Sequence, residues 1–310
     1  MPIIEVKNLY KRYGDTVAVD DVSFAVERGE IFGILGPNGA GKTTTVESIA
    51  GLRMPDSGSV TVLGLDPHRQ NQLVKQRLGV QLQESHLPDA ITVAEALDLY
   101  ASFYEDPADW GQLIVDLGLG EKRHTRYSRL SGGQKQRLSI ALALVGNPEV
   151  AILDELTTGL DPQARRDTWQ LVEAVRDRGV TIVLVTHFMD EAERLCDRIA
   201  VFDAGRLAAV DTPSGLIAAT TEGQRIRFRP TSELDERLLV DLPDVVAVHR
   251  DGPHLVVAGT ENLLFSVVSE LAARDVVPVD FRMEQPSLED AFVALTGRTF
   301  EFETTREAER

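Results

Sequence analysis

The residues most suited to phosphate chemistry form the run Gly36-Pro37-Asn38-Gly39-Ala40-Gly41-Lys42-Thr43, which fits the pattern G-x-x-x-x-G-K-[ST]. Its glycines allow consecutive backbone N–H groups to curl around a phosphate, and the N-terminus of a following helix adds a positive dipole. Lys42 can then reach the β- and γ-phosphates, and the hydroxyl of Thr43 can ligate Mg²⁺. A plain glycine-rich turn needs neither side chain, so the run predicts a nucleoside triphosphate site.

Two adjacent carboxylates, Asp154 and Glu155, follow the apolar run Val150–Leu153. A carboxylate at the end of a strand can hold Mg²⁺, directly or through water, and a second one can polarise an attacking water molecule. Taken alone, such a pair favours an ordinary strand end or turn, so its meaning depends on the other motifs.

The run Leu130-Ser131-Gly132-Gly133-Gln134 is a second candidate anion site. Two glycines at a helix start leave N–H groups exposed, and Ser131 adds a hydroxyl. Because one γ-phosphate does not need two complete cradles from one chain, the economical interpretation is that this run serves a nucleotide held by another copy. Standing alone, the five residues indicate a capped helix with a flexible entry.

Three single residues are weaker candidates. His187 follows the apolar run Thr181–Thr186 and could contact the γ-phosphate as a donor or cap the next helix. Gln83 could approach Mg²⁺ or the attacking water, although a lone glutamine is usually a surface residue. Tyr13 could stack on an adenine ring, although an isolated tyrosine more often packs against the protein.

The elements that would position these residues alternate between strand-like and helix-like segments over residues 1–220. Capping residues such as Ser131 and Asp161 mark helix starts. The alternation implies an α/β sheet, largely parallel, with sites at the carboxyl ends of its strands. Strands are expected at Glu30–Gly36, Ser59–Leu63, Leu78–Leu82, Val150–Leu153 and Thr181–Thr186, and helices at Lys42–Ala50, Val93–Tyr104, 131–146, 162–178 and Met189–Asp197.

The composition changes near residues 218–223. From Glu222 to Arg310 there are 18 acidic residues, 10 arginines and no lysine. The element order β-α-β-β-α-β matches a small α+β unit of the ferredoxin-like type. We therefore expect domains at 1–220 and 221–298, followed by a disordered charged tail at 299–310. The second domain's strands are expected at Arg225–Arg229, Val245–His249, His254–Ala258 and Val276–Met283, and its helices at Glu233–Asp241, Glu261–Ala273 and Ser287–Thr296.

The whole-chain composition narrows the class of protein. The net charge of -17 over 310 residues argues against broad electrostatic capture of nucleic acid, so no nucleic-acid partner is expected. Apolar runs such as Thr181–Val185 are far shorter than the roughly 18 residues that span a bilayer. Met1–Tyr10 does not read as a secretion signal. Cys196 is the single cysteine and is expected to be an inert buried thiol.

Together and in this order, the motifs resemble those of the ABC ATPase family. The resemblance covers about residues 3–215 and is specific, because independent motifs recur in the right order and spacing. The matching segments are Tyr13 for the aromatic loop, Gly36–Thr44 for Walker A, Gln83 for the Q-loop, Leu130–Gln134 for the family signature, Val150–Asp154 for Walker B, Glu155 for the catalytic base, Gly159–Asp161 for the D-loop and His187 for the switch histidine.

The resemblance implies a P-loop ATPase domain with a helical signature subdomain, in which two copies pair head to tail around two ATP molecules. Glu155 would be the catalytic base, with His187 and Gln83 sensing the γ-phosphate, and Mg²⁺ would be held by Thr43, Gln83 and Asp154. ATP would contact Tyr13, Gly36, Asn38, Gly39, Gly41, Lys42, Thr43 and Thr44 of one copy and Ser131, Gly132, Gly133 and Gln134 of the other.

One residue departs from the family pattern, because Leu156 stands where proline usually follows the catalytic glutamate. Proline fixes φ, so leucine relaxes the loop by roughly 0.4–1 kcal/mol at a compatible site. This substitution puts the rigidity of the approach to the D-loop in doubt.

The C-terminal segment 285–297 resembles the tail of ATPase subunits from ABC-2-type exporters, including the daunorubicin-resistance type. A generic amphipathic helix would also place Leu288, Phe292 and Leu295 on one face. With no spanning segment in the sequence, the resemblance implies a separate membrane-spanning permease, docked near Gln83–Tyr104, and a cytoplasmic location on the inner face of the cell membrane.

Other functions remain open at this level. The chain could be a soluble ABC ATPase not coupled to transport, an import subunit, or a non-enzymatic module with a decayed site. The C-terminal domain could bind a ligand, assist pairing or contact the membrane subunit.

Overall fold

The computed structural model describes residues 2–82, 87–220, 223–231, 234–260, 262–284 and 286–297. The chain divides into two compact units, Met1–Pro213 and Ser214–Arg310. The division precedes residue 220 because α8 (Pro213–Thr220) groups with the second unit. The tail expected at 299–310 lies outside the described residues.

The first unit contains two sheets. A six-stranded sheet has the order β5-β6-β7-β3-β8-β9, and all its neighbouring strands are parallel except the antiparallel pair β8 and β9. A separate three-stranded sheet has the order β2-β1-β4 and is antiparallel. The strands are β1 (Ile4–Tyr13), β2 (Thr16–Val26), β3 (Ile31–Leu35), β4 (Ser57–Val62), β5 (Leu78–Gln81), β6 (Val150–Asp154), β7 (Thr181–Thr186), β8 (Arg198–Asp203) and β9 (Arg206–Asp211).

The three-stranded sheet corrects the sequence-based expectation of one largely parallel sheet. The expected strand Ser59–Leu63 belongs to β4, which pairs antiparallel with β1. Every residue of β3, β6 and β7 is buried, as expected for parallel strands covered on both faces. In β1 and β2, buried residues are interspersed with exposed ones, which suits antiparallel strands with one solvated face.

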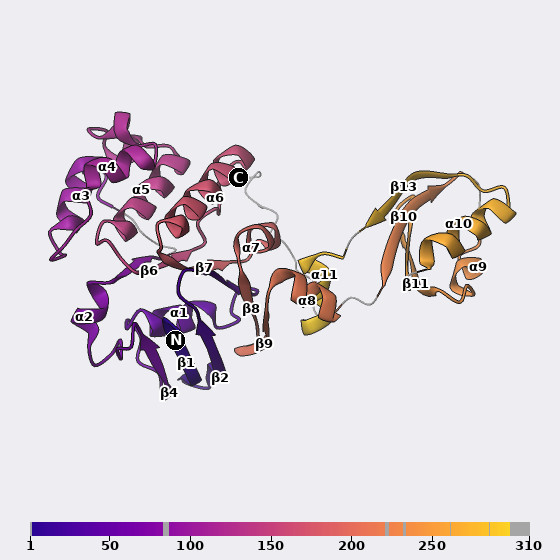
Figure 1. Cartoon of the computed structure of the whole chain (residues 1–310), viewed down its shortest axis with the longest axis horizontal. Coiled ribbons are helices and arrows are strands. Elements are labelled where there is room, and N and C mark those ends of the chain that lie inside the picture. Colours follow the sequence, from indigo (N-terminus) through magenta and orange to yellow (C-terminus); the bar gives the residue numbers. More distant parts are fainter. Residues whose placement is uncertain are drawn as a thin grey trace. The chain divides into compact units, whose positions relative to one another are not determined.

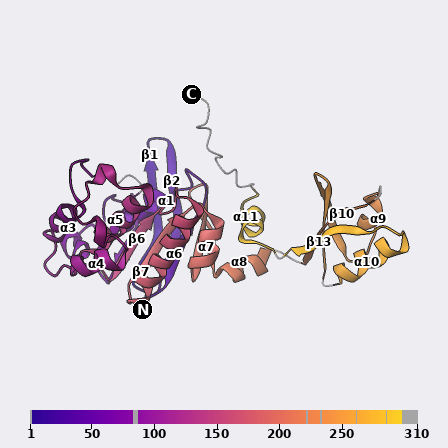
Figure 2. The same cartoon turned by 90° about the horizontal axis from the view of Figure 1, so that it is seen from above.

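The helices of the first unit fall into two groups. Helices α3, α4 and α5 lie together at one side of this unit, away from β1, β2 and β4 (Figure 1). They form the expected helical subdomain. Helices α6 and α7 lie side by side in both views (Figures 1 and 2). The helix bounds are α1 (Lys42–Ile49), α2 (Asn71–Lys75), α3 (Val93–Ala101), α4 (Trp110–Asp116), α5 (Gly132–Leu144), α6 (Pro162–Asp177) and α7 (Met189–Leu195).

One hydrophobic core joins the two sheets of this unit to α1. Phe24 on β2 stacks on Phe32 of β3 with ring centroids 5.3 Å apart, and its ring lies edge-on to Phe202 of β8 at 6.3 Å. Val46 and Ile49 of α1 belong to the same buried cluster. This packing holds the end of β3 and the start of α1 in place, and the phosphate loop connects those two points.

The second unit is a four-stranded antiparallel sheet with the order β11-β12-β10-β13. This order confirms the ferredoxin-like prediction. The same face of the sheet contributes Ile226, Phe228, Leu255 and Val257 to a core with α9 and α10. The elements after α8 are β10 (Gln224–Pro230), α9 (Arg237–Val240), β11 (Val245–Asp251), β12 (His254–Gly259), α10 (Leu263–Ala273), β13 (Pro278–Glu284) and α11 (Leu288–Thr296).

Two helices of the second unit differ in how closely they follow the sequence-based expectation. The helix expected at Glu233–Asp241 is limited to α9, and Glu233 lies outside the described residues. Ser287 caps α11 through a reciprocal capping box with Asp290, as its position before the expected helix suggests. Asp290 also forms an ion pair with Arg225 on β10, so the start of α11 is tied to the sheet.

Among the described residues, no helix has both the length and the apolar character needed to cross a membrane.

Candidate functional site

The phosphate loop connects the buried strand β3 to α1. Gly41 has φ 95°, and a Cβ at this position would lie 2.4 Å from the carbonyl oxygen of Ala18, so no larger residue fits. Lys42 is only 5% exposed, and its Nζ donates to the carbonyl oxygens of Gly36 at 2.6 Å and Pro37 at 3.1 Å. The loop therefore wraps around its own lysine, whose ammonium group is held against two backbone carbonyls of the loop.

Part of the predicted phosphate-binding run faces solvent. Asn38, Gly39 and Thr43 are exposed, while Thr44 is half-buried. Burial lowers the pKa of Lys42, and the nearby carboxylates of Glu155 and Asp154 act in the opposite direction. The cation and the two carboxylates thus belong to one site, and the described structure brings together Gly36, Asn38, Gly39, Gly41, Lys42, Thr43, Thr44, Asp154 and Glu155.

Asp154 lies at the end of β6 and is 2% exposed. Burial raises its pKa to about 6, with a further rise from Glu155 and an opposing effect from Lys42. Its backbone N–H donates to Oε1 of Gln81 at the end of β5, at 3.1 Å. Gln81 was not predicted, because a glutamine in a short apolar strand carries no signal of its partner.

The second carboxylate oxygen of Asp154 fits a metal ligand. Oδ2 is buried and has no hydrogen-bond partner among the described residues. Those residues also contain no group of three or more His, Cys, Asp or Glu that could cage a metal. Mg²⁺ usually binds through one or two carboxylates together with substrate phosphates and water, so a single orphaned oxygen beside a phosphate loop suits it.

Glu155 follows directly, in a conformation that few side chains adopt. Its φ is 50°, and its N–H donates to the carbonyl oxygen of Val185 on β7 at 2.9 Å. Nδ1 of His187 lies 3.1 Å from Oε1 of Glu155. This hydrogen bond is the main reason that the pKa of Glu155 lies below its usual value. Strained backbone of this kind concentrates at functional sites, and here it turns an ionised carboxylate toward the histidine.

The buried charge of Asp154 carries a stability cost that can be measured. Between its ordinary pKa of 3.8 and its folded value of about 6, the folded state holds a proton that the unfolded state has lost, so stability falls as pH rises through this window. At pH 7.5, without nucleotide or Mg²⁺, Asp154→Asn is expected to raise the free energy of unfolding by about 1–3 kcal/mol.

Denaturant unfolding as a function of pH tests this expectation. The difference between wild type and Asp154→Asn should be largest above pH 6 and disappear below about pH 4. Asp98→Asn, at an exposed position on α3, is the matched control and should show no such pH dependence. A pH-independent difference at Asp154 would contradict the explanation.

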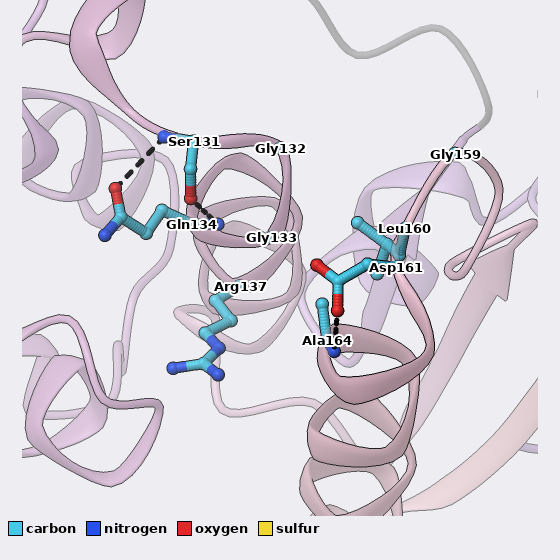
Figure 3. Close-up of a pocket in the computed structure, with 9 residues that line it drawn as sticks. All are labelled: Ser131, Gly132, Gly133, Gln134, Arg137, Gly159, Leu160, Asp161 and Ala164. Atoms are coloured by element: carbon cyan, nitrogen blue, oxygen red, sulfur yellow. Dashed lines mark hydrogen bonds between the residues drawn. The ribbon is translucent and has the colours of Figure 1, made fainter.

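A separate cavity surrounds the second predicted anion site. Ser131 caps α5, with its Oγ accepting from the N–H of Gln134 at 3.3 Å and its own N–H donating to Oε1 of Gln134 at 3.0 Å. Figure 3 shows this capped helix facing the start of α6 across the cavity. The cavity holds about 300 Å³ and is lined by Ser131, Gly132, Gly133, Gln134, Arg137, Gly159, Leu160, Asp161 and Ala164.

This cavity is built from the signature and the D-loop. Asp161 caps α6, because its Oδ1 accepts from the N–H groups of Gln163 at 2.9 Å and Ala164 at 3.0 Å. None of the described residues of the phosphate loop lines it. Arg137 and Ala164 were not predicted, since neither type is distinctive without the fold.

Four other predicted residues are placed as follows. Tyr13 is 40% exposed, and the Arg53 guanidinium lies 5.3 Å from its ring centroid. Leu156 is 1% exposed, so its side chain anchors the loop that proline would have stiffened. Cys196 is buried, as expected, and burial raises the pKa of its thiol. Gln83 lies outside the described residues.

A phosphate loop between a buried parallel strand and a helix, with carboxylates at the end of a neighbouring strand, defines a P-loop nucleoside triphosphatase. The family model described as "ABC transporter" matches residues 19–158. The chain is 36% identical over 307 residues to Nod factor export ATP-binding protein I of Rhizobium etli strain CFN 42, covering 97% of this chain and 95% of that protein. It is 33% identical over 309 residues to linearmycin resistance ATP-binding protein LnrL of Bacillus subtilis strain 168, covering 96% and 99%.

Solved structures agree with this assignment. The protein cbiO1 of Clostridium perfringens, described as part of the ABC transporter complex cbiONQ, superposes with a TM-score of 0.64 at 29% identity, covering 70% of this chain and 91% of that one. The cassette MJ0796, solved as a dimer in a post-hydrolysis state with ADP and Pi, superposes with a TM-score of 0.60 at 26% identity, covering 67% and 98%. The chain belongs to the ABC transporter family, as an ATP-binding and ATP-hydrolysing member.

Proposed function

We propose that this chain powers export through a separate membrane-spanning partner, by hydrolysing ATP in a site completed by a second copy of itself. The observation that carries the catalytic part is the group formed by Lys42, Asp154, Glu155 and His187, where a buried cation, an orphaned carboxylate oxygen and a carboxylate–histidine pair meet. The names of the relatives, which refer to Nod factor export and linearmycin resistance, support the export part.

Each residue of this group has a distinct role in the proposal. The phosphate loop and Lys42 bind the β- and γ-phosphates, and Thr43 and Asp154 hold Mg²⁺, which would neutralise phosphate charge when bound. Glu155 is ionised and directs the attacking water, while His187 fixes its orientation through the 3.1 Å contact. In this proposal, Gln83 contacts Mg²⁺ and the attacking water, and Tyr13 stacks on the adenine ring.

The signature cavity supports a shared site. It offers the N-terminus of α5, a serine hydroxyl and Arg137 to an anion, yet its described lining contains nothing from the phosphate loop. One chain therefore carries two half-sites, and each would need the complementary half-site of another copy to enclose a phosphate. Head-to-tail pairing of two copies would join Ser131 and Gly133 of one to the loop of the other, giving a closed homodimer with two ATP molecules.

A second cavity suits the membrane partner. It holds about 580 Å³ and lies between the segment after α1, α2, β5 and the segment after α3. Among the described residues of the predicted docking region Gln83–Tyr104, only Phe103 and Tyr104 line it. Its apolar lining includes Leu52, Leu78, Val80, Leu82 and Phe103. Phe103 is 62% exposed, so together with the neighbouring lining it gives a partner an apolar surface to cover. A short helix of the permease would fill this cavity, which would place the chain at the inner face of the membrane.

Phe103→Asp is expected to reduce co-purification of the membrane partner with the tagged chain at least about tenfold, because it places a charge in a desolvated interface. ATP binding by the isolated chain should not change. Val115→Asp is the control, because Val115 on α4 is 60% exposed but does not line this cavity. Equal recovery of the partner with wild type and Phe103→Asp would argue against docking at this cavity.

A further inference from the structure

A buried carboxyl group that has no part in the proposed chemistry lies on α7. Glu191 is 0% exposed, and its Oε1 accepts from the indole N–H of Trp169 on α6 at 3.0 Å. Its Oε2 has no hydrogen-bond partner among the described residues, and the same holds for the buried hydroxyl of Thr157. Burying a carboxyl group while one of its oxygens lacks a partner is unfavourable, so its presence here calls for a physical reason.

Glu191 lies close to two threonines, each near one member of the catalytic pair Glu155 and His187. Thr157 lies in the loop that follows Glu155, and Thr186 ends β7 immediately before His187. Burial raises the pKa of the Glu191 carboxyl, while Thr186, Trp169 and Thr157 lie close enough to act in the opposite direction. The carboxyl is thus the common neighbour of both catalytic loops.

Through Thr186, Glu191 can influence the position of His187. The Oγ1 of Thr186 accepts from the N–H of Phe188 at 3.0 Å, so the threonine side chain spans His187 and fixes the backbone on both sides of it. The ring of Phe188 lies 4.1 Å from the ring of His187. A displacement of Thr186 would therefore move the imidazole away from Glu155.

Helix α6 connects the surroundings of Glu191 to the signature cavity. Arg165 on α6 pairs with Asp190 at 3.2 Å and lies 4.5 Å from the ring centroid of Phe188, one helical turn before the Trp169 contact. Helix α6 begins at Asp161, which lines the cavity where the second copy is proposed to bind. Through these contacts, the partner-facing end of α6 and the histidine loop are held by the same buried cluster.

We propose that Glu191 is a positioning residue for His187, holding the histidine loop and the loop after Glu155 against α6. Trp169 fixes the carboxyl, and the carboxyl in turn limits the movement of Thr186 and Thr157. This inference rests on the proposed roles of His187 and Glu155. It assigns no contact with nucleotide to Glu191, so its loss should affect turnover rather than binding.

Steady-state ATPase kinetics test the proposal. Glu191→Ala should lower kcat by about 10- to 100-fold while KM for Mg·ATP stays within about twofold, because the phosphate loop is untouched. Glu191→Gln retains an oxygen acceptor for Trp169 and should stay within about threefold of wild type. Glu193→Ala, an exposed change on the same helix, should alter neither constant. A KM that rises as much as kcat falls would overturn the proposal.

A double-mutant cycle with His187→Ala separates positioning from general destabilisation. In that background, single-turnover hydrolysis followed over hours should fall less than about twofold on adding Glu191→Ala, because the residue it acts through is gone. An equal loss in both backgrounds contradicts the inference. If His187→Ala alone leaves kcat unchanged, the proposed role of His187 fails instead.

Trp169→Phe keeps the cycle informative if Glu191→Ala does not fold. It removes only the indole N–H that fixes the carboxyl, and it should lower kcat at least about threefold in wild type but not with His187→Ala. An unchanged kcat for Trp169→Phe would contradict the inference.

Discussion

Glu155→Gln is expected to lower kcat for ATP hydrolysis by about 100- to 10,000-fold, while ATP affinity stays within about threefold. The amide keeps the shape of the side chain and can still contact His187, but it cannot accept a proton from water. Nucleotide binding depends on the phosphate loop and Lys42, which this substitution does not alter. Steady-state ATPase assays combined with equilibrium ATP binding measure both quantities.

The control for this experiment is Glu121→Gln, which makes the same chemical change at an exposed position of the helical subdomain. Its kcat should equal that of wild type. Turnover by Glu155→Gln close to the wild-type value would remove Glu155 from the role of base. Loss of ATP binding together with turnover would instead indicate that the loop had been disturbed.

The second large effect concerns two inactive variants that restore each other. Ser131→Arg fills the signature cavity, and Lys42→Ala removes the phosphate-binding cation; each alone should reduce activity at least about 100-fold. Mixed in equal amounts, they should recover about a quarter of the wild-type activity, because random pairing makes half of the dimers mixed and each mixed dimer has one intact site.

Both changes placed in the same chain provide the control. A Ser131→Arg, Lys42→Ala double variant mixed with either single variant leaves no site free of mutation, so it should recover nothing. No recovery from the two single variants, under conditions where crosslinking shows mixed dimers, would contradict a site shared between copies.

The sequence predicted the parts of this protein that rest on local patterns. The strand before Gly36, the helix that begins at Lys42 and the cap at Ser131 follow from hydrophobic runs, glycine conformations and capping chemistry, which act over a few residues. The family signature and the element order of the second unit also follow from patterns within short segments. The structure confirms the fold class and the ferredoxin-like order.

Properties that depend on distant packing could not be predicted. The antiparallel pairing of β1 with β2 and β4 follows from which face the core covers. Alternating apolar residues such as Val22, Phe24 and Val26 indicate a half-buried strand, but they do not say which strands pair with it. The raised pKa of Asp154 depends on burial by the whole unit. The roles of Gln81 and Glu191 depend on hydrogen-bond partners that are distant in the chain. Gln81 pairs with Asp154, 73 positions away, and Glu191 pairs with Trp169, 22 positions away.

The contact between Trp169 and Glu191 has a practical consequence, because the chain contains only two tryptophans. In a Trp110→Phe background, the remaining indole is half-buried and donates to the buried carboxyl of Glu191. Its fluorescence should respond when nucleotide rearranges the helices around it, so the protein carries an intrinsic optical reporter of its own working cycle.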